Sequence, residues 1–340
     1  MQGRMMALAG AAGILLALAP TAMAKVNIET VRVGNPGNAP DTQHYDRGAV
    51  ADVFFIGTYE VTAGQYCQFL QAVAAEDTYR LYNAEMSTRS GGCKIQQSGT
   101  PGSYTYSVGE DAANRPVNLV SFWSACRFAN WLHNGQKTGA QGPTTTEDGA
   151  YTLNGYTGGW GLDITRNPGA RWFIPSADEW DKAAYHKNDG VTGNYWLYPT
   201  ASNDPPGHFL QEPDAGNCAN YYHASVAIDD PYYRTEVGEY ENSPSPYGTF
   251  DQAGNVAEWI ETVVNVDTHS VPPKTYRGTS GGYWGSPIWH LEPRNENNNP
   301  WSTGTSLGFR VATVPEPATI ALLASGGVGM LMSRRRRAGR

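Results

Sequence analysis

The stretch RWFIPSADEWDKAA, residues 171–184, decides the fold because it marks a junction between a strand and a helix. The strand-like run Arg171–Ile174 leads into Pro175, which has no backbone N–H to continue a ladder of hydrogen bonds. Ser176 and Glu179 then have the three-residue spacing of a capping box, the side-chain pattern that starts a helix. The sequence therefore predicts a short strand that ends before Pro175 and a helix that begins after Ser176.

Two further helices are expected, one beginning after Thr62 and one after Ser121. In both, apolar residues recur every three or four positions, which is typical of an amphipathic helix. These apolar positions are Tyr66, Phe69, Leu70 and Val73 in the first helix, and Ala125, Phe128, Ala129 and Leu132 in the second. Short extended segments are expected at 53–56, 276–278 and 309–313, and mostly turns over 186–250. The fold class is α+β with much irregular backbone.

The two ends of the chain differ from its middle. Arg4 precedes an apolar run, and Ala22-Met23-Ala24 has the pattern at which signal peptidase cuts, so we expect residues 1–24 to be a signal peptide rather than a membrane anchor. At the other end, the order Pro315-Glu316-Pro317, apolar stretch, arginine cluster resembles the PEP-CTERM sorting tail. That resemblance implies that an exosortase of a Gram-negative bacterium recognises and cuts residues 314–340.

A plain tail anchor is the alternative reading of this C-terminus, and it leads to the same compartment. Fifteen apolar residues, 318–332, are marginal for a membrane span. The tail recognised by an exosortase would give a transient membrane association, and on either reading the protein is expected in the periplasm, on the outer surface or in the extracellular matrix.

The remaining chain is acidic, with 18 basic and 31 acidic residues over 25–313 and a net charge of −13. Phosphate backbones would repel such a chain, which argues against nucleic acid as a partner. The same carboxylates suit a hard cation such as calcium. Four cysteines are present, Cys67, Cys93, Cys126 and Cys218, and none forms a C-x-x-C pair. In an oxidising compartment we expect one or two disulfides, with the pairing left open.

Six blocks occur in an order that resembles one family. They are GTYEVTAGQYCQFL (57–70), RPVNLVSFWSACRFANWL (115–132), RWFIPSADEWDKAA (171–184), GNVAEW (254–259), SGGYW (280–284) and GFRVA (308–312). Together they resemble the formylglycine-generating enzyme, or sulfatase-modifying factor, domain. The resemblance implies that this domain covers residues 49–313 after a lead-in at 25–48. It also implies a C-type-lectin-like fold with little regular structure and bound calcium.

Two calcium sites follow from the resemblance. The better-marked set lies in DQAGNVAEW, where the Asp251 and Glu258 carboxylates and the Gly254 and Val256 carbonyls could meet at one cation. The alternative is that Asp251 caps a turn and Glu258 pairs with an arginine such as Arg310. We favour the metal here.

The first site along the chain has a less certain register. Its expected ligands are the Asn220 side chain, the Tyr221 carbonyl, the Asp230 carboxylate and the Tyr232 carbonyl, with Asp229 as an alternative to Asp230. For this set, a bound calcium ion and an empty site both stay open. Removal of calcium should lower the melting temperature if the folded state alone binds it.

The stretch SGGYWGSPIWHLEPR, residues 280–294, decides whether the protein is an enzyme. In active members of the family, two cysteines five residues apart bind copper(I) here, because copper(I) selects sulfur ligands. The nominal positions are Ser286 and Leu291, and no cysteine follows Cys218. We therefore expect the oxidase chemistry, its copper cofactor and a catalytic residue set to be absent. The alternative is a formylglycine-generating-type oxidoreductase that acts through other residues.

Other chemistry has little support in the sequence. The seven histidines have no H-x-H or H-x-x-x-H spacing, and Ser286 with His290 lacks a recognisable orienting carboxylate. A binding role at the cell envelope is expected instead, for a protein or glycan. Its candidate residues are Trp289, His290, Arg294, Asn295, Asn297 and Trp301, since rigid aromatics with adaptable amides suit recognition.

Overall fold

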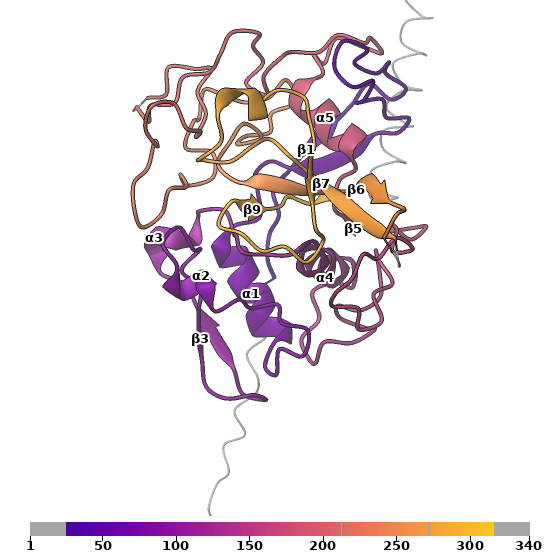
Figure 1. The fold of residues 1–340 in the computed structure, drawn as a ribbon, viewed down its shortest axis with the longest axis vertical. Helices are drawn as coiled ribbons and strands as arrows, with labels where there is room; N and C mark the ends of the chain where they lie inside the picture. Colours follow the sequence, from indigo (N-terminus) through magenta and orange to yellow (C-terminus); the bar gives the residue numbers. More distant parts are fainter. Residues whose placement is uncertain (1–24, 212, 271–272, 316–340) are drawn as a thin grey trace, which may run out of the picture.

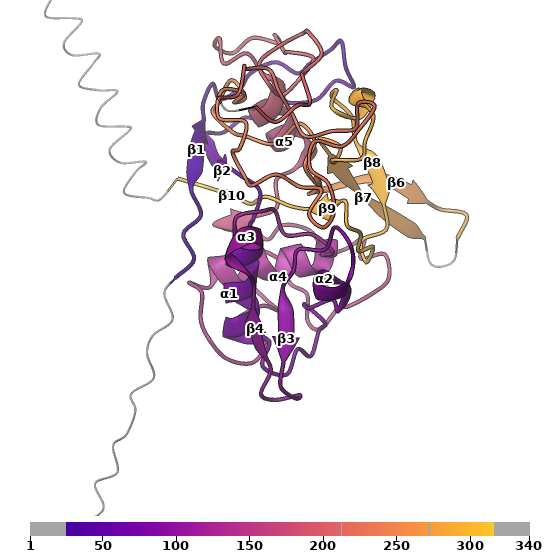
Figure 2. The same cartoon turned by 90° about the vertical axis from the view of Figure 1, so that its left-hand side faces the viewer.

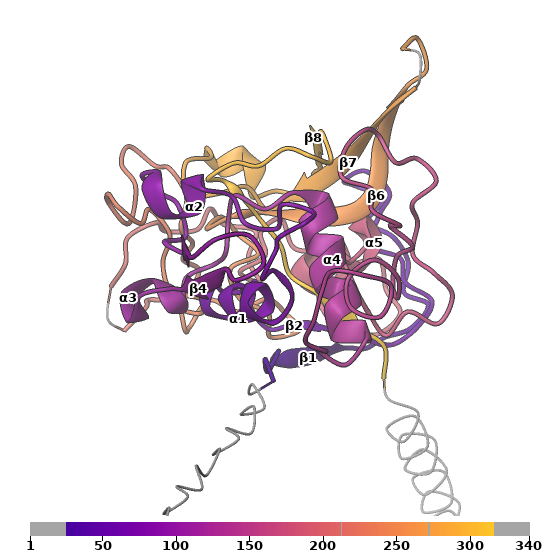
Figure 3. The same cartoon turned by 90° about the horizontal axis from the view of Figure 1, so that it is seen from below.

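The computed structural model describes residues 25–211, 213–270 and 273–315. The expected signal peptide, 1–24, lies outside the described residues, as does the sorting tail from residue 316 onward. The two ends of the described chain, near β1 (Thr30–Val33) and β10 (Ala312–Thr313), lie on the same side of the molecule (Figures 2 and 3).

The three predicted helices are confirmed, with their caps. In α1 (Ala63–Val73), Thr62 accepts a hydrogen bond from the backbone N–H of Gln65, and the Gln65 side chain closes the box. Ser121 caps α4 (Phe122–His133) in the same way without the reciprocal bond. The capping box of Ser176 and Glu179 starts α5 (Ala177–Tyr185). Each cap satisfies a backbone N–H that the helix itself leaves without a partner.

The first sheet joins distant parts of the chain in the order β1-β2-β10-β5, with antiparallel pairing. Its other members are β2 (Phe54–Gly57), which overlaps the expected segment 53–56, and β5 (Trp172–Phe173), which lies within the strand-like run 171–174. Ala312 pairs with Ile56 on one side and Phe173 on the other, so the last described strand holds this sheet together. Residues 30–33 of the lead-in form its edge strand.

The second sheet has the order β8-β7-β6-β9, and β6 and β7 extend as a long hairpin beyond the body of the molecule (Figures 2 and 3). Its strands are β6 (Ala257–Asp267), β7 (Lys274–Ser280), β8 (Glu296–Asn298) and β9 (Leu307–Gly308). Sequence periodicity does not reveal β6, because its first four residues are all buried and show no alternation. Strand β9 runs parallel to β6, which places the GNVAEW and GFRVA blocks side by side.

The core lies where α1 and α4 pack near these sheets (Figure 1). Tyr66 and Phe69 from α1 contact Phe128 from α4 at ring-centroid distances of 6.1 and 5.3 Å, and Phe128 also meets Phe309 at 5.4 Å. The remaining elements are short and cover the outside. They are α2 (Glu85–Thr88), α3 (Glu110–Ala113), η1 (Ile288–His290) and the hairpin β3 (Gln96–Ser98) and β4 (Thr105–Ser107).

The long segment 186–250 has only turns and isolated bridges in its described part, as expected. Buried polar side chains hold this irregular backbone. The Arg234 guanidinium donates to the Pro116 and Gly92 carbonyls at 2.7 and 3.0 Å, and the Asp214 carboxylate accepts from Ser243 at 2.7 Å. Along the ranges that the structure describes, no helix has the length and apolar character needed to cross a bilayer.

Candidate functional site

The turn after β7 brings the two nominal cysteine positions together. Gly282 has a φ of 69°, in the left-handed region that favours glycine. A Cβ placed on it would lie 3.0 Å from the Cβ of His290 and 3.3 Å from both the Ser286 Cβ and a Leu291 methyl. Because η1 folds back over the turn, Ser286, His290 and Leu291 converge on Gly282 and leave no space at that corner.

Neither nominal position offers a metal ligand of the right kind. Ser286 is buried, with 1% of its surface exposed. Its hydroxyl accepts a hydrogen bond from the Tyr283 backbone N–H at 3.1 Å. Leu291 is fully buried in a small apolar cluster with Tyr198, Tyr221 and two alanines. A hard hydroxyl and an aliphatic side chain cannot replace a pair of soft thiolates.

The four cysteines lie elsewhere as free, buried thiols, so the expected disulfides are not formed in this structure. Burial raises the pKa of Cys67 and of Cys218 to about 11, and it also raises the pKa of Cys93 and Cys126. Since the thiolate is the form that attacks a substrate or binds copper, none of these thiols has the environment of a reactive one.

His290 has a carboxylate partner that sequence reasoning missed. Its Nδ1 forms an ion pair with Glu296, which comes from β8 and therefore reaches it only through the sheet. Burial lowers the pKa of His290, and the neighbouring Glu296 opposes that shift. Among the described contacts no hydrogen bond joins Ser286 to His290, so the two do not form a nucleophile and base.

Part of the predicted ligand set gathers around the exposed Trp289. We call this group, Trp289 with the half-buried His290 and Arg294, the Trp289 patch. The Trp289 and His290 rings lie 3.8 Å apart between centroids, and the Arg294 guanidinium covers the Trp289 ring at 4.5 Å. Arg294 also donates to the Trp289 carbonyl at 3.2 Å. Trp289 is 49% exposed, an unusual degree for tryptophan, so the patch presents a rigid aromatic and a cation to solvent.

The other members of that set line two cavities, one of which shares Arg294 with the Trp289 patch. Asn295 and Asn297 line a shallow cavity of about 370 Å³ with Arg294 and Arg47. Trp301 packs edge-to-face on Trp160 at 4.4 Å and lines a different, larger cavity. The sequence therefore grouped six residues that the fold distributes over at least two surfaces.

The two predicted calcium sets are neighbours, because Asn220 and Gly254 pair in a parallel bridge. A Cβ on Gly254 would lie 2.0 Å from the Asn220 carbonyl oxygen, so only glycine fits there. Asn220 is 1% exposed, and its side-chain oxygen has no hydrogen-bond partner in the described structure. Such a buried, unsatisfied oxygen is what a hard cation would use. Asp230 of the same set is exposed and accepts a hydrogen bond from Ser90.

The second set has its main carboxylate occupied by protein groups. Glu258 is paired through both oxygens with Arg310, at 2.6 Å each, and also accepts from the Trp180 indole at 2.8 Å. This is the alternative that the sequence left open. Asp251 accepts from the Gly238 N–H, and burial raises the pKa of Asp251 to about 7. Within the described ranges, no three histidine, cysteine or acidic side chains cluster closely enough to hold a metal by themselves.

Glu60 belongs to the same buried region and was not foreseen. It is 2% exposed, one of its oxygens has no partner, and the other accepts from Asn255 at 3.4 Å. Burial raises the pKa of Glu60 well above its ordinary value, and the nearby Asp251 and Glu258 raise it further. One weak indication of this buried carboxylate was present in the sequence: Glu60 directly precedes the apolar Val61 and the helix-capping Thr62.

Comparison with known proteins decides the family. Residues 23–314 match the sulfatase-modifying factor enzyme 1-like domain, and residues 313–337 match the PEP-CTERM protein-sorting motif. The chain belongs to the sulfatase-modifying factor family. Both predicted resemblances are thus confirmed, and the sorting motif points to an exported protein of a Gram-negative bacterium.

Solved structures agree with this family's formylglycine-generating-enzyme-like fold. The crystal structure of CarF is 20% identical with a TM-score of 0.50, over 85% of this chain and 99% of that one. Treponema denticola variable protein 1 is 18% identical with a TM-score of 0.51, over 85% and 96%. At these identities the likeness shows the shared fold, and the predicted fold class is confirmed.

Among curated proteins, the sulfatase-modifying factor domain of this chain is similar to part of a larger protein. It is 24% identical over 277 residues to the serine/threonine-protein kinase pkn1 of Chlamydia pneumoniae. The match covers 76% of this chain and 32% of that kinase, so the chain spans about a third of the relative's length.

Proposed function

We propose that this exported member of the sulfatase-modifying factor family lacks copper-dependent oxidation of cysteine to formylglycine and serves a binding or structural role at the cell envelope. The observation that supports the proposal is the packed corner at Gly282, where Ser286 and Leu291, the nominal positions of the family's two copper-binding cysteines, come together. Copper(I) bound there would need soft sulfur ligands, and the final third of the chain contains no thiol.

The oxidase part of the proposal is tested with a peptide that contains Cys-x-Pro-x-Arg, incubated with the purified protein, copper and oxygen. Conversion of the cysteine to formylglycine is followed by mass spectrometry. We expect no conversion beyond that of copper alone. Turnover that needs the protein would refute the proposal and establish the alternative, an oxidoreductase acting through non-standard residues.

The Trp289 patch supports the binding role. Exposed tryptophan beside an arginine is typical of recognition surfaces, where an aromatic ring contributes contact area at low cost in side-chain entropy. Trp289→Ala should therefore abolish retention of the protein on envelope extract or on an immobilised glycan panel. Phe209→Ala is the matched control, because Phe209 is also exposed but lies outside the patch. Retention unchanged in Trp289→Ala would assign the binding role elsewhere.

Calcium is proposed as a structural ion rather than a catalytic one. Asn220 contributes an unpartnered buried oxygen and Asp230 an exposed carboxylate in the first set, while Asp251 is the available carboxylate of the second. A ligand present at 100 times its dissociation constant stabilises the folded state by about 2.7 kcal/mol. EGTA should therefore lower the melting temperature, and added calcium should restore it. A melting curve unchanged by EGTA would exclude both sites.

Processing of the tail is the last part of the proposal. An exosortase that recognises the PEP-CTERM motif is expected to cut near residue 315, before the apolar stretch and its arginines. The mass of the protein recovered from the envelope measures this directly. An intact C-terminus would favour a permanent tail anchor.

A further inference from the structure

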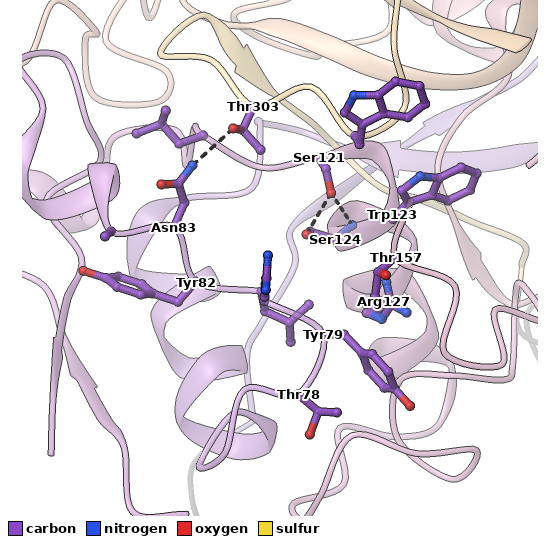
Figure 4. Close-up of a pocket in the computed structure, with 15 residues that line it drawn as sticks. Thr78, Tyr79, Tyr82, Asn83, Ser121, Trp123, Ser124, Arg127, Thr157 and Thr303 are labelled. Carbon is purple, nitrogen blue, oxygen red and sulfur yellow. Dashed lines mark hydrogen bonds between the residues drawn. The ribbon is translucent and has the colours of Figure 1, made fainter. Parts of the chain in front are cut away.

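A cavity of about 620 Å³ lies away from the Gly282 corner and the Trp289 patch. It opens between the loop 78–84, the start of α4 and the segment 301–303 (Figure 4). Its volume falls within the usual range for small-molecule sites. The Asn83 side chain donates to Thr303 at 3.2 Å, which bridges two of these walls. Neither Ser286 nor His290 lines it, so the cavity is distinct from the family's reaction centre.

Trp123 presents an unused hydrogen-bond donor to this cavity. Trp123 is 1% exposed, and its indole N–H has no hydrogen-bond partner in the described structure. The ring is fixed by edge-to-face contacts with Phe122 at 5.1 Å and Tyr156 at 5.0 Å. In Figure 4 the indole nitrogen lies on the side of the ring that faces Ser121 and Ser124. Buried N–H groups are rarely left unpaired, so this donor is positioned for an oxygen atom of a ligand.

An arginine without a described counter-charge lines the cavity of this acidic protein. No aspartate or glutamate lines it, and the exposed Arg80 guanidinium makes no hydrogen bond or ion pair with any described residue. The second lining arginine, Arg127, is already paired with Glu147 at 2.7 and 2.8 Å. The N-terminus of α4 also faces this space, since its cap Ser121 and its residues Trp123 and Ser124 line the wall. Both features favour an anionic group.

The rest of the lining combines aromatic rings with short hydroxyl side chains. Trp301 is 38% exposed, and Tyr79 is held under the Arg127 guanidinium at 4.6 Å. Thr157 and Ser124 supply hydroxyls that can both donate and accept (Figure 4). Sugars present apolar ring faces that can pack on aromatic rings and hydroxyls that can pair with the hydroxyl side chains. An acidic sugar adds a carboxylate.

We propose that this cavity binds an acidic saccharide. The sugar carboxylate pairs with Arg80, a ring face packs on Trp301, and a ring oxygen accepts from the Trp123 indole N–H. The inference goes beyond the proposed function and does not depend on it, because the Trp289 patch contributes nothing to this cavity.

The test is calorimetric titration of the full chain with a trisaccharide of galacturonic acid, compared with the neutral galactose trisaccharide. We expect binding of the acidic sugar and at least about tenfold weaker binding of the neutral one, the effect of one charge-assisted pair. Arg80→Gln should weaken binding of the acidic sugar about tenfold and leave that of the neutral sugar unchanged. Trp301→Ala should weaken both about fivefold or more.

Two matched controls accompany these variants. Arg89→Gln removes an exposed arginine outside the cavity, and Phe209→Ala removes an exposed aromatic side chain outside both the cavity and the Trp289 patch; neither should change the dissociation constant. Trp123→Phe keeps the ring and removes only the N–H, and should weaken binding if the melting temperature is retained. No binding of either sugar at millimolar concentration would overturn the proposal. So would binding that ignores Arg80 and Trp301, or an acidic peptide that binds as tightly as the sugar.

Different variants test the proposed function and the saccharide site, so each can fail without the other. Loss of envelope retention in Trp289→Ala with sugar binding intact supports both proposals, while formylglycine production would refute the proposed function and leave this one standing.

Discussion

Replacement of Arg310 by methionine tests whether one buried ion pair holds together three segments that lie far apart in the sequence. Arg310 is fully buried, and its guanidinium forms two hydrogen bonds of 2.6 Å with Glu258. It also donates to the carbonyls of Gly57 and Phe250 at 2.9 and 2.8 Å. These contacts connect β2, the loop before β6, and β6 itself to the end of the chain.

The expected loss of stability is large, because methionine would leave Glu258 as a buried charge without its counter-ion. Breaking a buried pair by removing one partner costs about 3–5 kcal/mol. Each carbonyl left without a donor adds about 1–3 kcal/mol. The nearest described ionisable groups, Glu60 and Asp251, are acidic and repel Glu258 when ionised, so they do not replace the lost counter-ion. We expect Arg310→Met to lower the free energy of unfolding by at least about 4 kcal/mol, a large part of a typical 5–15.

The assay is urea unfolding followed by tryptophan fluorescence, since urea does not screen ion pairs as a salt does. The double variant Glu258→Met with Arg310→Met should recover much of the loss, because two apolar side chains leave no unpaired charge. Arg89→Met is the control; its exposed pair with Glu85 should contribute about 0.5 kcal/mol or less. A loss below about 1 kcal/mol in Arg310→Met would refute the reasoning.

Four further outcomes are expected. Burial raises the pKa of Asp181 to about 7 although Arg47 opposes it; because the folded state then binds the proton more tightly than the unfolded chain, stability should fall by up to about 4 kcal/mol as pH rises from about 4 to 7. Asp181→Asn should reduce the slope of that pH profile in urea unfolding, and Asp251 and Glu60, whose pKa values burial also raises, should account for the remaining slope; an unchanged slope would assign the whole dependence to those groups. The pair Ser286→Cys with Leu291→Cys should create one copper(I) site per chain, measured by competition with a chromogenic chelator, whereas either single variant should not; no gain in the double variant would show that the two positions do not face each other. EGTA should lower the melting temperature of the parent protein, with recovery on adding calcium. Trp289→Ala should lose envelope retention at an unchanged melting temperature, and a parallel drop in stability would mean that Trp289 supports the fold instead.

Much of the local structure could be predicted because short-range chemistry specifies it. Thr62, Ser121 and Ser176 start helices by accepting from N–H groups three residues ahead, a bond that depends on spacing alone. The turn-rich segment 186–250 was likewise evident from its composition. The sequence also offered a pair between Glu258 and Arg310 as the alternative to a calcium site, and the structure forms that pair.

The strand β6 and the partners of the buried charges could not be predicted in this way. Residues 257–260 are buried, so the sequence shows no alternation of apolar and polar side chains there. Glu296 reaches His290 only because β8 pairs with β7, and Glu60 meets Asn255 across 195 positions. Such contacts depend on chain topology, which local patterns do not encode.

By itself the sequence determined the family and the absence of cysteine after Cys218, since both depend only on which residues occur and in what order. Only the tertiary structure decided that Ser286 and Leu291 converge on one glycine and that Glu258 belongs to Arg310. It also separated Trp289 from Trp301 and placed Trp301 in the same cavity as Arg80 and the unpaired indole of Trp123. The physical reason is that charge pairing and cavities arise from atoms brought together by sheet topology, over distances along the chain at which sequence spacing carries no information.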